Sequence, residues 1–99
     1  MRKLLALAVI VLGLTGCATI DYNTPPAADW PALQVVETDA RYCKPFDIGC
    51  AWVNLREMVC YVFIGAEAVR EHELAHCRGY DHPGESTMRD LWAKWKKGL

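Results

Sequence analysis

Apolar and polar residues recur with different spacings along the chain, and these spacings predict where strands and helices lie. Two β-rich runs, Ala51–Leu55 and Val59–Ile64, flank the short stretch 56–58, which predicts an antiparallel pair of strands. A shorter apolar run at 32–38 predicts a first strand. The N-terminal run from Leu4 to Leu12 is apolar throughout and too short to span a bilayer stably.

Two further segments have the pattern of helices. Ala66–Cys77 consists almost entirely of good helix formers, and the next helix-breaking residue is Gly79. Pro83 and Gly84 then predict a turn. The sequence therefore predicts a helix at 66–77 that ends before a bend.

The last helix is predicted to begin after a cap at Ser86 or Thr87 and to end near Lys97. Its apolar side chains recur at helical spacing and form one stripe: Met88, Leu91, Trp92 and Trp95. Two interpretations of the stripe remain open, a face that closes the core and an amphipathic face that rests on a membrane surface.

These elements predict a small α+β domain. We expect a short antiparallel sheet packed on the helix at 66–77, plus a C-terminal amphipathic helix. The expected organisation is a signal peptide at 1–16, a tether at 17–31, where three prolines interrupt a polar segment, and one domain at 32–99. A domain this small buries roughly 60–65% of its unfolded surface, so disulfides or a metal are expected to help stabilise it.

The N-terminus has the features of an export signal, with Arg2 and Lys3 before the apolar run. The following Leu14-Thr15-Gly16-Cys17 resembles the lipobox of bacterial lipoproteins. The resemblance implies cleavage before Cys17, a lipid on its thiol and attachment to a membrane. Ala18 in the next position implies the outer membrane of the bacterial cell envelope, with the domain facing the periplasm. The alternative is that Cys17 is an unmodified residue in an uncleaved N-terminal helix, which would then be an ordinary membrane anchor.

The charge balance argues against nucleic acid as a partner. The whole chain has a formal net charge of −1, and loss of two basic residues with the signal makes the mature chain more acidic. The remaining basic residues are scattered apart from a small cluster at the C-terminus: Lys94, Lys96 and Lys97.

All three histidines lie between His72 and His82. His72 and His76 are four residues apart, so on a helix they project from one face on adjacent turns. Two imidazole nitrogens bound to one Zn²⁺ lie a little over about 3 Å apart, which side chains on adjacent turns can reach. The spacing predicts a zinc site.

Glu73 lies about 100° round the helix from His72, beside the expected metal rather than on it. There it is placed to accept a proton from a water that the metal activates. Gly79 allows the chain to bend back and bring His82 to the same ion. Three protein ligands leave one position open, as in catalytic zinc sites. Cys77 remains a conceivable fourth ligand, although it points away from the histidine face.

The stretch from His72 to His82 resembles the signature of the metzincin zinc metallopeptidases, His-Glu-x-x-His-x-x-Gly-x-x-His. The resemblance implies that His72, His76 and His82 bind zinc and that Glu73 is the general base of peptide-bond hydrolysis. In that family a methionine in a tight turn lies beneath the metal, and Met88 is the candidate. The alternative is that Met88 is a core residue of the last helix.

The chain departs from the metzincin pattern in two ways: it is small, and it lacks one residue that stabilises the transition state in some members of the family. No tyrosine follows Met88, so the tyrosine that this turn supplies in some metzincins is missing. Four other residues are candidates for stabilising an oxyanion, and their alternative is a solvated or packed surface role: Arg78, Tyr80, Tyr61 and Arg89.

Four cysteines remain once Cys17 is assigned to lipid, an even count that in an exported protein implies two disulfides. Of three possible pairings we favour Cys43 with Cys50, and Cys60 with Cys77. A zinc site made of cysteines is disfavoured because the chain has no Cys-x-x-Cys spacing.

Three functions follow as hypotheses. The first is a membrane-anchored zinc metallopeptidase that acts on a peptide or protein. The second is a non-catalytic zinc-binding envelope lipoprotein, either an adaptor or a metal buffer. The third is a structural lipoprotein without metal.

Overall fold

The computed structural model describes residues 19–98. The predicted signal peptide, and the Cys17 at which a lipid is predicted, lie outside the described residues. None of the helices between residues 19 and 98 has the length and apolar character needed to cross a membrane.

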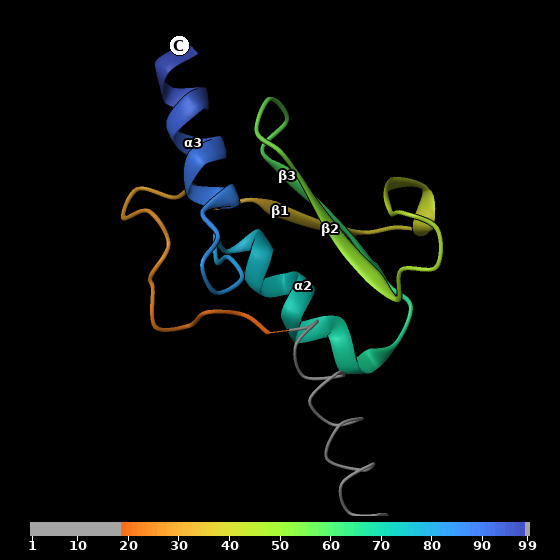
Figure 1. Cartoon of the computed structure of the whole chain (residues 1–99). Helices are drawn as coiled ribbons and strands as arrows, with labels where there is room; N and C mark the ends of the chain where they lie inside the picture. Colours follow the sequence, from red (N-terminus) through yellow and green to blue (C-terminus); the bar gives the residue numbers. More distant parts are fainter. Residues whose placement is uncertain (1–18, 99) are drawn as a thin grey trace, which may run out of the picture.

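The fold is a small α+β globule in which a three-stranded sheet packs on one helix and a second helix follows at the C-terminus (Figure 1). The strands are β1 (Gln34–Glu37), β2 (Gly49–Asn54) and β3 (Val59–Ile64). The helices are α2 (Arg70–Cys77) and α3 (Thr87–Gly98), with short 3-10 turns η1 (Ala40–Tyr42) and η2 (Glu67–Val69). The predicted fold class is confirmed.

The order of the sheet is β1-β3-β2, so β3 is central and β2 is an edge strand. β2 and β3 form the predicted antiparallel pair, with Gly49 opposite Ile64. β1 instead pairs parallel to β3, with Gln34 opposite Val59, and this corrects the expectation of a purely antiparallel sheet. The long connection through η1 and β2 makes the parallel pairing possible, because parallel neighbours need a crossover rather than a tight turn.

The core lies where β2, β3 and the end of α2 meet. Val62 and Cys60 on the central strand are 1% and 0% exposed. The apolar stripe of α3 packs against this core, as the first of its two interpretations predicts. The helix predicted at 66–77 is present, but its first residues form η2 and the regular helix begins at Arg70.

The cap of α3 comes from a residue that was not predicted. Ser86 precedes the helix, but its hydroxyl donates to the Asp90 carboxylate at 2.7 Å. The backbone N–H of Met88 donates instead to Asp81 Oδ1 at 2.8 Å. Asp81 thus caps α3 from the loop after α2 and fixes that helix relative to the histidines.

The segment predicted to be a tether contacts the domain at several of its described residues. Ile20 is 8% exposed, and the indole N–H of Trp30 donates to the carbonyl of Cys77 at 3.0 Å. Asp29 accepts from the indole of Trp92 at 2.9 Å and from Lys96 at 2.6 Å. Residues 19–31 contain no helix or strand, yet Trp30 contacts the end of α2 and Asp29 contacts α3.

Both favoured disulfides are present. The Cys43–Cys50 bridge closes the loop before β2, and the Cys60–Cys77 bridge joins the central strand to the last residue of α2. Since Cys77 is in a disulfide, it is not a fourth metal ligand.

Candidate metal centre

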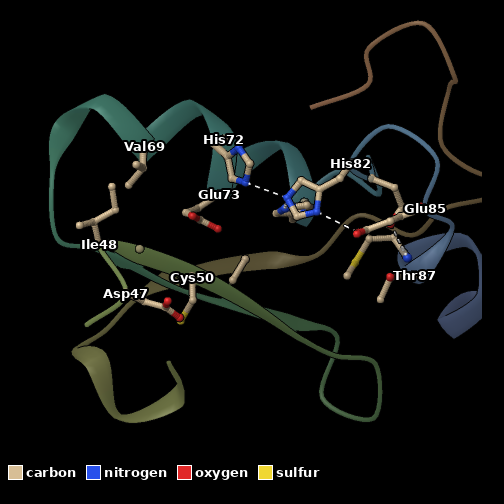
Figure 2. Close-up of a pocket in the computed structure, with 14 residues that line it drawn as sticks. Asp47, Ile48, Cys50, Val69, His72, Glu73, His82, Glu85 and Thr87 are labelled. Atoms are coloured by element: carbon tan, nitrogen blue, oxygen red, sulfur yellow. Dashed lines mark hydrogen bonds and ion pairs between the residues drawn. The ribbon is translucent and has the colours of Figure 1, made fainter. Parts of the chain in front are cut away.

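The three histidines meet at one point. The Nε2 atom of His82 lies 3.2 Å from Nε2 of His76 and 3.1 Å from Nε2 of His72. Nitrogens bound to one tetrahedral Zn²⁺ are about 3.3 Å apart, so these separations suit a shared ion. The three residues form a group that can hold a metal ion. Figure 2 shows the rings of His72 and His82 turned toward one another, and both residues line one cavity.

Local structure explains why the three rings converge. His72 and His76 lie one turn apart on α2, while the chain reverses after Cys77 through Gly79, whose φ is +92°. Glycine adopts this left-handed conformation without the steric cost that other residues incur. The bend returns His82 to the histidine face of α2, as the spacing of the motif predicts.

Hydrogen bonds orient two of the rings. Nδ1 of His76 lies 2.8 Å from the carbonyl oxygen of Tyr80, and Nδ1 of His82 lies 2.9 Å from Glu85 Oε1. A carbonyl and a carboxylate only accept, so each Nδ1 donates to its partner, and a ring that is neutral then has its lone pair on Nε2. Lone pairs this close repel one another unless a cation lies between them. Partners of this kind orient the histidine ligands of metal sites.

Burial also favours a ligand role for His76. It lowers the pKa of the imidazole, and the neighbouring His82 and His72 act in the same direction, while the hydrogen bond to the Tyr80 carbonyl opposes them. The neutral ring, which binds metals, is therefore favoured near pH 7.

Glu73 points from α2 toward β2, into the same cavity as the histidines (Figure 2). The residue is 6% exposed, and this burial raises the pKa of its carboxyl group from 4.5 to about 7, with the charge of His82 opposing the rise. A cation held by the histidines acts in the same sense as His82 and favours the carboxylate. A buried carboxyl group of this kind can accept a proton and give it back.

Gly49 allows β2 to approach α2 at this point. A Cβ atom there would lie 2.6 Å from Val69 Cγ2 and 3.1 Å from Glu73 Oε2, so a side chain would displace both. Gly49 was not among the predicted site residues, and its place directly before Cys50 and the β-rich run is the signal that could have identified it.

The cavity has a volume of about 550 Å³ and is bounded by α2, the start of β2 and the start of α3. β2 contributes Gly49, Cys50 and Ala51 to its wall. β2 is an edge strand and pairs with β3 on one side only. Along its other side, the backbone N–H and C=O groups form no hydrogen bonds to another strand of the described sheet.

The hydrogen-bonding register of β2 and β3 shows which backbone groups of β2 face away from β3. The Gly65 N–H donates to the Ile48 carbonyl at 2.9 Å, so alternate residues from Ile48 onward bond to β3. Gly49, Ala51 and Val53 then turn their backbone groups toward the outer edge.

Met88 lines the cavity, but it lies in the first turn of α3 rather than in a tight turn. This corrects the Met-turn expectation. Met88 also packs against the core, which agrees with the alternative interpretation of Met88 as a core residue of the last helix.

The four oxyanion candidates do not line the cavity among the described residues. Arg78 pairs with Glu71 at 2.7 Å, and the Tyr61 hydroxyl donates to Glu57 at 2.9 Å. The ring of Tyr80 packs against another tyrosine, at 5.2 Å between centroids. Arg89 lies 3.4 Å from the buried carboxylate of Asp81.

Comparison of the chain with protein-family models, with curated proteins and with solved structures found no match.

Proposed function

We propose that the protein is a zinc-dependent metallopeptidase resembling the metzincins, anchored through Cys17 in the bacterial outer membrane and facing the periplasm. The observation that carries the proposal is the convergence of three Nε2 atoms, two of them 3.1 and 3.2 Å from the third, beside a buried carboxylate.

The donor set fits zinc. Three neutral imidazoles with oriented Nδ1 atoms suit Zn²⁺ better than Ca²⁺ or Mg²⁺, which prefer oxygen ligands. Zinc held by His72, His76 and His82 would supply a Lewis acid beside the cavity, able to polarise a carbonyl and to make water more acidic.

In this proposal Glu73 accepts the proton of the attacking water and transfers it to the leaving amine. The carboxyl group is buried beside the metal ligands, where water has limited access and a proton transfer is efficient. The reaction adds water across one peptide bond and leaves a carboxylate and an amine, so it needs no further reactant.

The edge of β2 would hold the substrate. An extended peptide can pair with the outward backbone groups of Gly49, Ala51 and Val53 as an added strand, which places a peptide bond along the wall of the cavity. The wall of the described cavity has no Lys or Arg, so it lacks the cation that would bind a substrate's C-terminal carboxylate. This favours cleavage within a chain over removal of its last residue.

The experiment has two parts. Metal analysis of the purified chain is expected to give one Zn²⁺ per chain, and His82→Ala is expected to remove it. The zinc-loaded chain is then incubated with a peptide library, and cleavage is followed by mass spectrometry.

Glu73→Gln is the matched variant, because it keeps the shape of the side chain and loses its basicity. It is expected to bind zinc like the parent and to cleave about 10²- to 10⁴-fold more slowly. Zinc binding without cleavage by the parent would instead support the non-catalytic adaptor or metal buffer. A chain that does not bind zinc would support the structural lipoprotein.

A further inference from the structure

The N-terminal segment 20–30 covers the loop 77–82, which joins the second histidine to the third. The backbone N–H of Asp21 donates to the carbonyl of Asp81 at 2.9 Å. The rings of Tyr22 and Tyr80 lie 5.2 Å apart between centroids. Two successive residues of the loop therefore contact two successive residues of the segment.

The other end of the segment covers the bend. The Trp30 indole donates to the Cys77 carbonyl at 3.0 Å. A Cβ on Gly79 would lie 2.7 Å from the ring of Trp30 and 2.9 Å from Cβ of Pro26, so the segment is in close contact with the bend. Ile20, at 8% exposed, is buried at the start of the segment.

Three of the contacted residues are next to a ligand or support one. Cys77 follows His76 directly, and Asp81 precedes His82 directly. The carbonyl of Tyr80 accepts from Nδ1 of His76. A shift of the loop would therefore move one ligand and misorient another.

We infer that segment 20–30 is a positioning element of the metal centre, which holds loop 77–82 so that His76 and His82 meet His72. The inference rests on the metal site of the proposed function and extends it. Residues 78–82 contain a left-handed residue and no helix or strand, and only Arg78, Gly79 and Tyr80 among them donate backbone hydrogen bonds to α2, so packing from segment 20–30 helps to fix the rest of the loop. The partners that hold metal ligands in place typically change metal affinity 10- to 100-fold when they are removed.

The test compares zinc affinity in the full chain with its disulfides formed, by competition with a chromophoric chelator. Tyr22→Ala combined with Trp30→Phe is expected to weaken zinc binding at least about tenfold, because it removes one ring and one hydrogen-bond donor. Tyr22→Phe keeps the ring and is expected to bind zinc like the parent. Phe46→Ala is the matched control, since it removes an aromatic ring that is fully exposed.

A second measurement separates positioning from loss of fold. The visible spectrum of bound Co²⁺ reports ligand geometry, and Trp30→Phe alone, which keeps a ring in place, is expected to change that spectrum. An unchanged Co²⁺ spectrum together with parental zinc affinity in the double variant would overturn the inference and leave the metal site intact. A parent chain that does not bind zinc would overturn the proposed function and this inference with it.

Discussion

His76 and His82 are oriented by different kinds of hydrogen-bond acceptor, and only one of the two acceptors can be removed by a substitution. The acceptor for His76 is the backbone carbonyl of Tyr80, which every residue at that position would supply. The acceptor for His82 is the side chain of Glu85, which is exposed and lies three residues away. The contribution of these Nδ1 hydrogen bonds to zinc affinity is therefore best measured by substituting Glu85.

Glu85→Ala is expected to weaken zinc binding about 10- to 100-fold, because His82 loses the acceptor that sets its tautomer and orientation. Equilibrium competition with a chelator measures the change. Glu57→Ala is the control, since Glu57 is also an exposed carboxylate that accepts hydrogen bonds, but it lies in the turn between β2 and β3. Equal losses in the two variants would show that Glu85 has no specific role at the metal.

Gly79 and Gly84 both have positive φ, +92° and +77°, but only Gly79 is closely packed. Gly79→Ala combines a left-handed non-glycine residue with overpacking against Trp30, and is expected to lower the free energy of unfolding by about 2–4 kcal/mol. Gly84→Ala meets nothing within 4 Å and is expected to cost about 1 kcal/mol. Urea unfolding of both variants tests the difference, and equal costs would argue against close packing at Gly79.

At the scale of elements, the strand pair that local sequence determines was predicted, whereas the parallel pairing of β1 and the cap of α3 were not. The β2–β3 pair follows from two β-rich runs with a short turn between them. The parallel pairing of β1 depends on how the loop at 38–48 crosses the sheet, which no local pattern encodes. The cap of α3 was missed for the same reason, because Asp81 lies outside the helix and its immediate flanks.

The two disulfides are expected to contribute unequally. Cys60–Cys77 spans 17 residues and joins β3 to α2, whereas Cys43–Cys50 spans 7 residues and joins the loop before β2 to the start of that strand. Replacing both cysteines of the longer bridge by alanine is expected to lower the free energy of unfolding by about 3 kcal/mol, against about 2 kcal/mol for the shorter one.

Urea unfolding of the two alanine pairs measures this difference. The pair at 60 and 77 is also expected to bind zinc more weakly, since Cys77 adjoins His76, whereas the pair at 43 and 50 serves as the control. A larger loss of stability from the shorter bridge would contradict the prediction.

At the scale of the whole molecule, the ligands were predicted from one short motif, but the structure that supports them comes from distant parts of the chain. Three histidines and Glu73 follow from helical spacing and the bend at Gly79. The contacts of Trp30 and Tyr22 join residues 47 and 58 positions apart, and the polar, proline-rich composition of their segment predicts only a tether.

Zinc is expected to stabilise the whole fold, because the site joins α2 to the loop that caps α3. At a free concentration 1,000 times the dissociation constant, a metal that binds only the folded chain adds about 4 kcal/mol to the free energy of unfolding. Thermal unfolding in the presence of EDTA is expected to show a lower Tm, and added Zn²⁺ is expected to restore it. A Tm that does not respond to either would contradict a metal site in this position.

The burial of Ile20 limits how far the domain can lie from an anchor. Only three peptide units separate Cys17 from Ile20, and an extended chain covers at most about 3.6 Å per residue. A lipid on Cys17 would thus keep Ile20 within about 11 Å of its point of attachment. Asp21, the next residue, bonds to the loop that carries His82. A peptidase held in this way would act on chains close to the bilayer surface and would not reach across the periplasm.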